Sequence, residues 1–384
     1  MTNFATNNDE IIKNIDYFCN ETIKNYSSKR NFVLGSPHNN VSKLSPYIGR
    51  RFITEEQILK KIIKNKSDFK IDEFVTQLFW RTYFRGWLET HPWVYEQYEK
   101  ENKSYNIPSK TGIKCFDSWT EELIETGYLH NHARMWYASI WIFTLNKSWQ
   151  SGAYFFENNL LDWCPASNTL GWRWVAGLHT INKHYVATEN NINFFTNFEF
   201  KPQKQINEKV IPIEYDFLNN EALNFSYKET KLSNVLQNIG VILNNNDLSL
   251  NLVLDDLNLS YDACVFKNSE KKIYKNNLII KFEESIFNDV IKRNINFSIK
   301  EDFESLLKWI QIKKIKNLVV PYETVGNTIL KNSTFLKKIN ENKIEIIFYL
   351  RKWDEKAFPF AQKGFFKFKK KIPCLLELNG FCEL

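Results

Sequence analysis

The sequence contains no run of 18 or more apolar residues, which argues against a membrane-spanning helix. Its six cysteines are scattered without a Cys-x-x-Cys pair, which argues against a zinc or iron–sulfur site and is typical of reduced thiols. The N-terminal segment MTNFATNNDEIIKN lacks the basic and then apolar pattern of a signal peptide. We therefore expect a cytoplasmic protein that binds neither a membrane nor a metal ion.

Common catalytic and nucleotide-binding motifs are also missing. Neither Gly-x-Gly-x-x-Gly nor Gly-x-x-x-x-Gly-Lys-[Ser/Thr] occurs, so no phosphate-binding loop can be placed. No Ser-His-Asp or Cys-His set can be inferred from spacing. His130 and His132 are not expected to share a metal ion, because residues two apart on a helix point in different directions.

The overall composition is ordinary, but the two halves of the chain differ. Hydrophobic residues make up 43% of the 384 residues and charged residues 25%, which is typical of a globular protein with room for two domains. Ten of the 12 tryptophans precede residue 200. We predict a boundary within 201–217, where polar residues and two prolines interrupt any helical period, and domains over 1–205 and 206–384. The formal net charge of +7 is weak support for nucleic-acid binding.

Hydrophobic periodicity predicts secondary structure along both halves. The first half is predicted to be helical at 54–66, 71–90, 116–126, 131–145 and 150–161. The second half has short, apolar, β-branched runs, predicted as strands at 248–256, 262–266, 315–323 and 343–350, and helix-like segments at 282–293 and 302–314. Strand–helix alternation is typical of a parallel sheet. The predicted fold class is α + α/β, an all-helical domain followed by a smaller α/β parallel-sheet domain.

The segment VSKLSPYIG, residues 41–49, has the pattern of a helix start. Ser42 and Ser45 flank Leu44, and a proline follows. Free backbone N–H groups and hydroxyls at such a start can bind an anion, in particular a diphosphate. An ordinary serine cap with proline in the first turn explains the same pattern, and the segment alone leaves both interpretations open.

The segment QLFWRTYFRGW, residues 77–87, places Gln77, Trp80, Arg81 and Phe84 on one stripe of a helix. An amide, an indole and a guanidinium on one stripe are too polar for a core face and suit the wall of a pocket for an aromatic ligand. A partly exposed amphipathic helix with a buried tryptophan is the alternative interpretation.

Two further segments place polar residues beside aromatic ones. Asn131 and Arg134 lie at the head of the very aromatic helix predicted at 131–145. Asp162 is a candidate partner for Arg134, or for an imide N–H of a ligand. Trp172 and Trp174 stand two apart, so on a helix they point to nearly opposite sides, although two structural tryptophans in a helical core are the commoner outcome.

Together and in this order, these motifs resemble the flavin-binding domain of the DNA photolyase and cryptochrome family. The motifs are Ser-x-Leu-Ser-Pro-Tyr at 42–47, Leu-x-Trp-Arg at 78–81, His-Asn-x-x-Arg-Met at 130–135, Asp-x-x-x-Ala-x-Asn at 162–168 and Trp-x-Trp at 172–174. The resemblance covers about residues 20–200. It implies an all-helical domain that holds FAD in a folded shape.

The resemblance also implies which residues bind the cofactor. They are Tyr26, Ser42, Lys43, Leu44 and Ser45 at the phosphates and ribityl chain, and Gln77, Arg81, Asn131, Arg134, Asp162, Cys164 and Asn168 around the rest of FAD. An arginine beside the flavin would favour its anionic reduced form. Whether a second, antenna chromophore is present stays open.

The implied partner is UV-damaged DNA, bound by a protein expected to be a monomer. The residues implied to contact the DNA or the flipped-out lesion are Arg30, Trp80, Met135 and Trp174. The residues implied to act in catalysis are Gln77, Asn168 and the electron-carrying Trp149 and Trp172. Lys43, Arg50, Arg51, Arg85, Arg173 and Lys183 lie near the motifs and are candidates either for phosphate contacts or for plain surface charges.

The sequence departs from the family pattern at several positions. Gln77 stands where dimer photolyases commonly have Glu, and Asn131 and Met135 stand where (6-4) photolyases have histidines. Cys164 replaces the second acid of an Asp-Gly-Asp motif, and the outermost tryptophan of the electron-transfer chain falls at Asn106, beside Tyr105. The α/β half follows the helical half, whereas the family's antenna domain normally precedes it.

Three functions remain open at this point. The first is a FAD-dependent photolyase, with cyclobutane pyrimidine dimers as the favoured lesion. The second is a cryptochrome-like blue-light photoreceptor without repair activity. The third is a flavin-less relative, which would be colourless. The stretch WDEKAFPFAQKGFFKFKKKIP, residues 353–373, resembles a segment near the antenna domain of photolyases and favours an antenna-like second domain.

Overall fold

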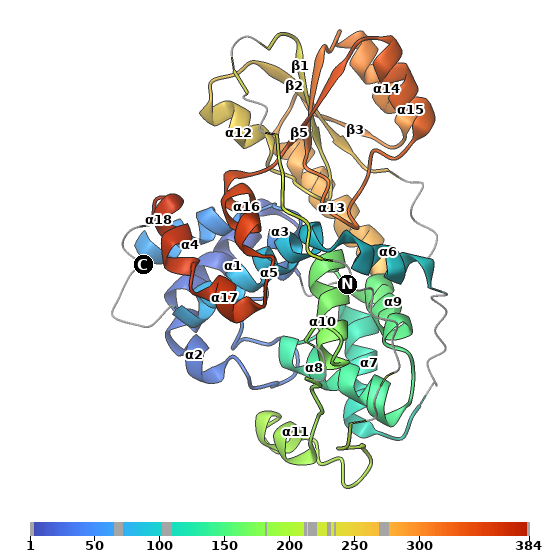
Figure 1. Cartoon of the computed structure of the whole chain (residues 1–384). Coiled ribbons are helices and arrows are strands. Elements are labelled where there is room, and N and C mark those ends of the chain that lie inside the picture. The colour runs from blue at the N-terminus through green and yellow to red at the C-terminus, as the bar shows by residue number, and fades with distance from the viewer. Residues whose placement is uncertain are drawn as a thin grey trace.

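The computed structural model describes residues 4–64, 72–101, 110–180, 183–210, 213, 221–228, 232–233, 236–268 and 276–381. Figure 1 shows a helical part and, above it, a sheet with helices on both faces. This arrangement confirms the predicted fold class of helices followed by a parallel α/β unit. Within the described residues, no helix is both long and apolar enough to span a bilayer. The proposed domain limits themselves stay a prediction.

The helical part begins with α1 and ends with α11. The helices are α1 Asn8–Asn20, α2 Tyr26–Lys29, α3 Ser45–Gly49, α4 Glu55–Lys64, α5 Asp72–Thr90, α6 Pro92–Lys100, α7 Lys114–Thr126, α8 Asn131–Ser139, α9 Trp149–Asn159, α10 Pro165–Val175 and α11 Glu189–Phe195. A π-helical turn, Ile140–Thr144, continues α8. All five predicted helices are confirmed. At the start of α4, Thr54 and Gln57 each accept a hydrogen bond from the other's backbone N–H, and this capping box stabilises the first turn of the helix.

The second part is built on a five-stranded parallel sheet in the order β3-β2-β1-β4-β5. Its strands are β1 Ile239–Leu243, β2 Tyr261–Phe266, β3 Ser298–Lys300, β4 Asn317–Pro321 and β5 Glu345–Tyr349. The predicted strands at 262–266, 315–323 and 343–350 are confirmed. The strand order reverses between β1 and β4, and in such sheets ligands bind beyond the carboxyl ends of the strands at that point.

The strand predicted at 248–256 is wrong. Those residues include a short helix, α12 Asn251–Asp256, and the strand before it is β1. The alternating leucines of 248–254 have the period of a strand, but leucine favours helices, whereas the β-branched residues of IGVIL favour strands. Asp247 accepts a hydrogen bond from the Ser249 backbone N–H and turns the chain just before the helix.

Side chains from alternate positions of β1 enter two different cores. Val241 packs on the face covered by α12 and α13 Asn277–Arg293, and this core continues into α1, α4 and α5 of the helical part (Figure 1). Ile242 packs on the other face, against α14 Phe303–Ile312 and α15 Ser333–Glu341. The predicted helices at 282–293 and 302–314 are therefore confirmed. A separate core, rich in tryptophan, holds α6 to α11 together.

After β5 the chain returns to the helical part. It forms α16 Lys352–Ala357, α17 Phe365–Lys369 and α18 Ile372–Leu378, which lie near α4 and α5 in Figure 1. Trp353 is fully buried, stacks on Phe79 of α5 with ring centroids 4.7 Å apart, and donates a hydrogen bond to the Thr82 hydroxyl. These contacts fix the C-terminal segment on α5.

Candidate functional site

The ion pair between Arg134 and Asp162 joins the head of α8 to the segment before α10. Arg134 Nη2 donates to Asp162 Oδ2 at 2.9 Å, and its Nε donates to the Leu129 carbonyl at 2.7 Å. The predicted partnership is confirmed. The other carboxylate oxygen, Asp162 Oδ1, is buried and has no hydrogen-bond partner among the described residues. A buried oxygen of this kind is costly unless something donates to it, so the position beside it suits a donor such as a water or an N–H group of a ligand.

The neighbouring polar residues differ in exposure. Asn131, the first residue of α8, is exposed, and Met135 is half-buried one turn further along. Asn168 lies half-buried in the first turn of α10, where its Nδ2 donates to the Cys164 carbonyl at 3.2 Å. Gln77 is half-buried on α5. Their roles at a flavin stay predictions.

The histidine that caps α8 is neutral. The His130 side chain accepts a hydrogen bond from the His132 backbone N–H, which satisfies one free donor of the first turn. Burial, and then the neighbouring His38, lower the pKa of His130 to about 3. Among the described residues, no cluster of three or more His, Cys, Asp or Glu could hold a metal ion.

The α5 stripe is covered by the C-terminal segment. Trp80 stacks face to face on Phe365, with ring centroids 3.4 Å apart and planes 11° apart, and the Phe84 ring centroid lies 5.2 Å from that of Trp80. Arg81 donates to the Gly49 carbonyl at 3.1 Å. The sequence does not indicate Phe365 as a neighbour of Trp80, because Phe365 lies far from α5 along the chain and its stretch resembles a segment near the antenna domain of photolyases. Whether Trp80 contacts a lesion stays a prediction.

The serine motif begins a helix, but without a serine cap. The N-cap residue of α3 is Leu44. The Leu44 backbone N–H donates a weak hydrogen bond of 3.4 Å to Ser42 Oγ. Lys43 has a positive φ of 53°, and its Nζ donates to the Pro37 carbonyl at 2.6 Å. Ser45 is half-buried. The predicted helix start is confirmed, and its role in phosphate binding is untested.

Tyr26, the first residue of α2, and Arg30, which follows α2, both contact side chains of α5. Tyr26 is 9% exposed and packs edge to face on Phe74, with ring centroids 5.5 Å apart. Arg30, half-buried, pairs with Glu73 at 3.1 Å. The predicted FAD contact of Tyr26 and DNA contact of Arg30 remain predictions.

The tryptophans of α9 and α10 lie in the aromatic core. Trp172 packs against α9 and forms an edge-to-face pair with Trp141, whose ring centroid is 6.2 Å away. Trp149 stacks on Tyr98 at 5.7 Å, and Trp174 stacks on Tyr185 at 5.3 Å. The motifs of the sequence did not indicate that Trp141 contacts Trp172 or that Tyr98 contacts Trp149. Tyr105 and Asn106, considered for the outer end of the electron-transfer chain, lie outside the described residues.

Glycine at position 152 makes the close packing of Trp172 possible. A Cβ at Gly152 would lie 2.3 Å from an atom of the Trp172 ring, whereas a Cβ at Gly171 of α10 would meet nothing within 4 Å. We expect Gly152→Ala to lower the free energy of unfolding by about 1–3 kcal/mol through overpacking. Gly171→Ala is the matched control and should raise stability by about 0.4–1 kcal/mol. Urea denaturation measures both, and equal effects would contradict the contact.

A cavity of about 110 Å³ lies where the helical part meets the loops after β1 and β4. The helical part contributes Arg50, Arg81 and Cys164 to its lining, and the loops contribute Asn245 and Thr324. Burial disfavours the Cys164 thiolate, but the charge of Arg81 and hydrogen bonds from Ser167 outweigh it and hold the pKa of the thiol below its usual value.

Several arginines near the motifs are structural. Arg50, Arg51, Arg85 and Arg173 are at most 8% exposed, so the surface-charge interpretation is wrong for them, and contact with phosphates stays a prediction. Lys183 is exposed.

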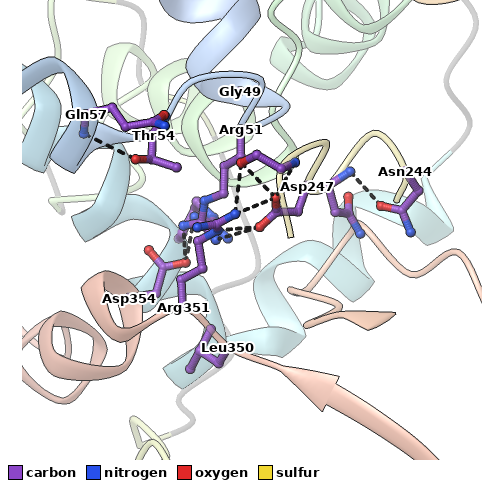
Figure 2. A network of polar contacts seen from close by, with 12 residues as sticks. Gly49, Arg51, Thr54, Gln57, Asn244, Asp247, Leu350, Arg351 and Asp354 are labelled. Atoms are coloured by element: carbon purple, nitrogen blue, oxygen red, sulfur yellow. Dashed lines mark hydrogen bonds and ion pairs between the residues drawn. The ribbon is translucent and has the colours of Figure 1, made fainter. Parts of the chain in front are cut away.

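Two of these arginines belong to a buried ion-pair network, shown in Figure 2. Arg51 and Arg85 lie 2.5 and 2.8 Å from the same oxygen of Asp354. Arg51 also lies 4.0 Å from Asp247, which Arg351 contacts at 2.5 Å. The network ties α5 and the end of α3 to the loop after β1 and the start of α16.

Comparison with known proteins finds relatives for about half of the chain. Residues 74–204 match the FAD binding domain of DNA photolyase. The deoxyribodipyrimidine photo-lyase of Alkalihalophilus pseudofirmus is 27% identical over 210 residues, which are 51% of this chain and 43% of that protein. The chloroplastic/mitochondrial cryptochrome DASH of Arabidopsis thaliana is 30% identical over 178 residues, 41% of this chain and 30% of that protein.

One solved structure gives a weaker match. The bacterial class III photolyase from Agrobacterium tumefaciens aligns with a TM-score of 0.42 and 23% identity, over 49% of this chain and 42% of that one. In all three of these matches the chain spans less than half the length of the relative.

Proposed function

We propose that this chain, whose helical part belongs to the DNA photolyase and cryptochrome family, binds FAD and uses blue light to repair pyrimidine dimers in DNA, with cyclobutane dimers favoured. The observation that carries the proposal is the Arg134–Asp162 pair with its unpaired buried oxygen. The pair lies within the part of the chain that matches the family, on two of its motifs.

The residues present fit a flavin ring. Asp162 Oδ1 is positioned to accept a hydrogen bond from a ring N–H, because Arg134 holds the other oxygen. The Arg134 guanidinium, 17% exposed, favours negative charge on a neighbouring group. Bound reduced FAD would supply an electron from its photoexcited state. Asn168, anchored on the Cys164 carbonyl, is the third polar group of this set.

The surrounding aromatic residues are proposed to exclude water and to carry electrons. Trp172, 3% exposed, and Trp149, 2% exposed, lie on neighbouring helices of one core. Trp174 is only partly buried, which suits stacking on a base that has left the duplex, whereas Phe365 already stacks on Trp80, so Trp80 is proposed to line the lesion site without stacking. Stacking of this kind is worth roughly 1–3 kcal/mol per base.

A second function, a blue-light photoreceptor without repair, is favoured by Gln77, which stands where dimer photolyases commonly have an acid. Cryptochrome DASH proteins are also among the relatives. The two functions share flavin binding and differ in whether light changes the DNA.

The test is to purify the protein, record its visible spectrum and assay dimer-containing single- and double-stranded DNA under blue light against a dark control. We expect yellow protein and light-dependent loss of dimers. A yellow protein that repairs no lesion would contradict the enzyme and support the photoreceptor. A colourless protein that does not take up added FAD would contradict both.

A variant tests the carboxylate directly. Asp162→Asn is expected to weaken FAD binding by roughly 10-fold to 150-fold, because a charged hydrogen bond contributes about 1.5–3 kcal/mol. Asp289→Asn is the matched control, since Asp289 also pairs with an arginine, Arg293 at 2.7 Å, but lies on α13. Titration of the apoprotein with FAD, followed by flavin fluorescence, measures both. Equal affinity of the two variants would contradict the proposed contact.

A further inference from the structure

The segment from Lys356 to Leu376 combines positive charge with aromatic rings and contains no Asp or Glu. Its lysines are Lys356, Lys363, Lys367, Lys369, Lys370 and Lys371. Its phenylalanines are Phe358, Phe360, Phe365, Phe366 and Phe368. The segment lies outside residues 74–204, which match the flavin-binding domain, so the proposed function has given it no role.

The structure divides these side chains between two sides of α17. Phe365 and Phe368 point inward and are 6% and 0% exposed. Phe366 points outward and is 82% exposed. A single exposed phenylalanine is ordinary, but here it stands among exposed lysines and not in a polar, neutral surface. Lys371 extends over the ring of Phe360, with its Nζ 5.6 Å from the centroid.

The position of α17 connects this surface to the proposed lesion site. Phe365 stacks on Trp80 and lies edge to face with Tyr83 at 5.3 Å. Figure 1 shows α17 next to α5. Phe366 and Lys367 directly follow Phe365, so these exposed residues begin within two positions of the ring that covers Trp80.

We infer that the surface of Lys363, Phe366, Lys367, Lys369, Lys370 and Lys371, here called the α17 surface, binds single-stranded DNA. Lysines neutralise phosphates, and an exposed aromatic ring stacks on a base whatever its sequence, which is the usual combination in proteins that bind single strands. The inference rests on the proposed function, because it places the strand next to Trp80.

The first test removes three charges. Binding of fluorescein-labelled, undamaged oligothymidylate is measured in the dark at several salt concentrations. For Lys367→Ala/Lys369→Ala/Lys370→Ala, the slope of log K against log salt should decrease by about 2, since each single-strand phosphate contact contributes about 0.7. At 0.1 M salt this is a loss of roughly 100-fold in affinity. The control Lys331→Ala/Lys337→Ala/Lys338→Ala removes three exposed lysines at and just before α15 and should leave the slope unchanged.

The second test removes the ring. Phe366→Ala should weaken binding by roughly 5-fold to 150-fold without changing the salt slope, because stacking and not charge is lost. Phe366→Trp should restore it. A stacking effect and a charge effect that separate in this way are not expected from a change in folding.

Other outcomes overturn the inference. Equal salt slopes for the two triple variants would contradict it. Binding of phosphatidylserine vesicles without binding of oligothymidylate would also contradict it. The assay uses no light and no lesion, so it is independent of repair. A triple variant that keeps its flavin spectrum and its DNA affinity contradicts the α17 surface alone, while a colourless wild-type protein that binds oligothymidylate contradicts the proposed function alone.

Discussion

Replacing Asp354 by asparagine is expected to lower the free energy of unfolding by about 3–5 kcal/mol, because it leaves two arginines buried without their shared carboxylate. Asp354 is 0% exposed, and Arg51 and Arg85 are 4% and 7% exposed. The change keeps the size of the side chain, so the loss measures charge and not packing. Asp247, 4.0 Å from Arg51, is too distant to replace the lost contact (Figure 2).

The effect of Asp354→Asn should depend on pH. Burial opposes ionisation of Asp354, but Arg51 and Arg85 outweigh it and hold the pKa of its carboxyl below the usual value. A carboxyl with a lowered pKa in the folded protein stabilises it fully above its unfolded pKa of about 3.9, and this stabilisation is lost as the pH falls toward the folded pKa. The difference between wild type and variant should therefore be constant from pH 5 to 7 and shrink below about pH 4.

Chemical denaturation at several pH values measures this difference. Glu304→Gln is the control, because its ion pair with Lys308 is 2.6 Å long but has both side chains exposed. Exposed pairs of this kind contribute little, so the control should unfold like the wild type. A variant at Asp354 that also unfolds like the wild type would contradict the network.

Replacing Trp353 by alanine is expected to cost about 3–5 kcal/mol, as is usual when a large buried aromatic side chain is removed. Trp353 is 0% exposed, stacks on Phe79 and donates a hydrogen bond of 2.8 Å to the Thr82 hydroxyl. Removing it leaves a cavity between α16 and α5, and Thr82 loses its donor. The C-terminal segment should then be released from α5.

Two variants separate the contributions to this contact. Trp353→Phe keeps the stack on Phe79 but removes the N–H group, and should cost less than Trp353→Ala. Leu378→Ala truncates a side chain in α18 that is 51% exposed, and should have little effect on stability. Urea denaturation gives the free energies, and limited proteolysis reports release of α16 to α18. Unchanged protection of this segment in Trp353→Ala would contradict its role as an anchor.

The local patterns of the sequence were sufficient for most helices and for part of the site. The helix at 71–90 could be predicted because its apolar residues recur at helical spacing and His91-Pro92 ends it. The pair of Arg134 and Asp162 could be predicted because both residues belong to motifs with known spacing. The strand mistakenly placed at 248–256 shows the limit of local pattern, since alternating leucines fit a turn and a short helix equally well.

Contacts between distant segments were not predictable. Arg51 and Asp354 are 303 residues apart, and Trp353 and Thr82 are 271 apart. Phe365 covers Trp80 only because α16 to α18 return to the helical part after β5. Nothing in either segment indicates its partner, because burial and charge pairing depend on where the chain path brings two surfaces together.

The sequence by itself therefore determined the helical and α/β character of the two parts, the similarity of residues 74–204 to the FAD binding domain of DNA photolyase, and the polar residues of the motifs. Only the tertiary structure decided that Arg50, Arg51 and Arg85 are buried in ion pairs and that the C-terminal segment lies on α5. The physical reason is that spacing along the chain sets local conformation and the direction of side chains. The partner that a side chain meets, and its exposure, are properties of the folded whole.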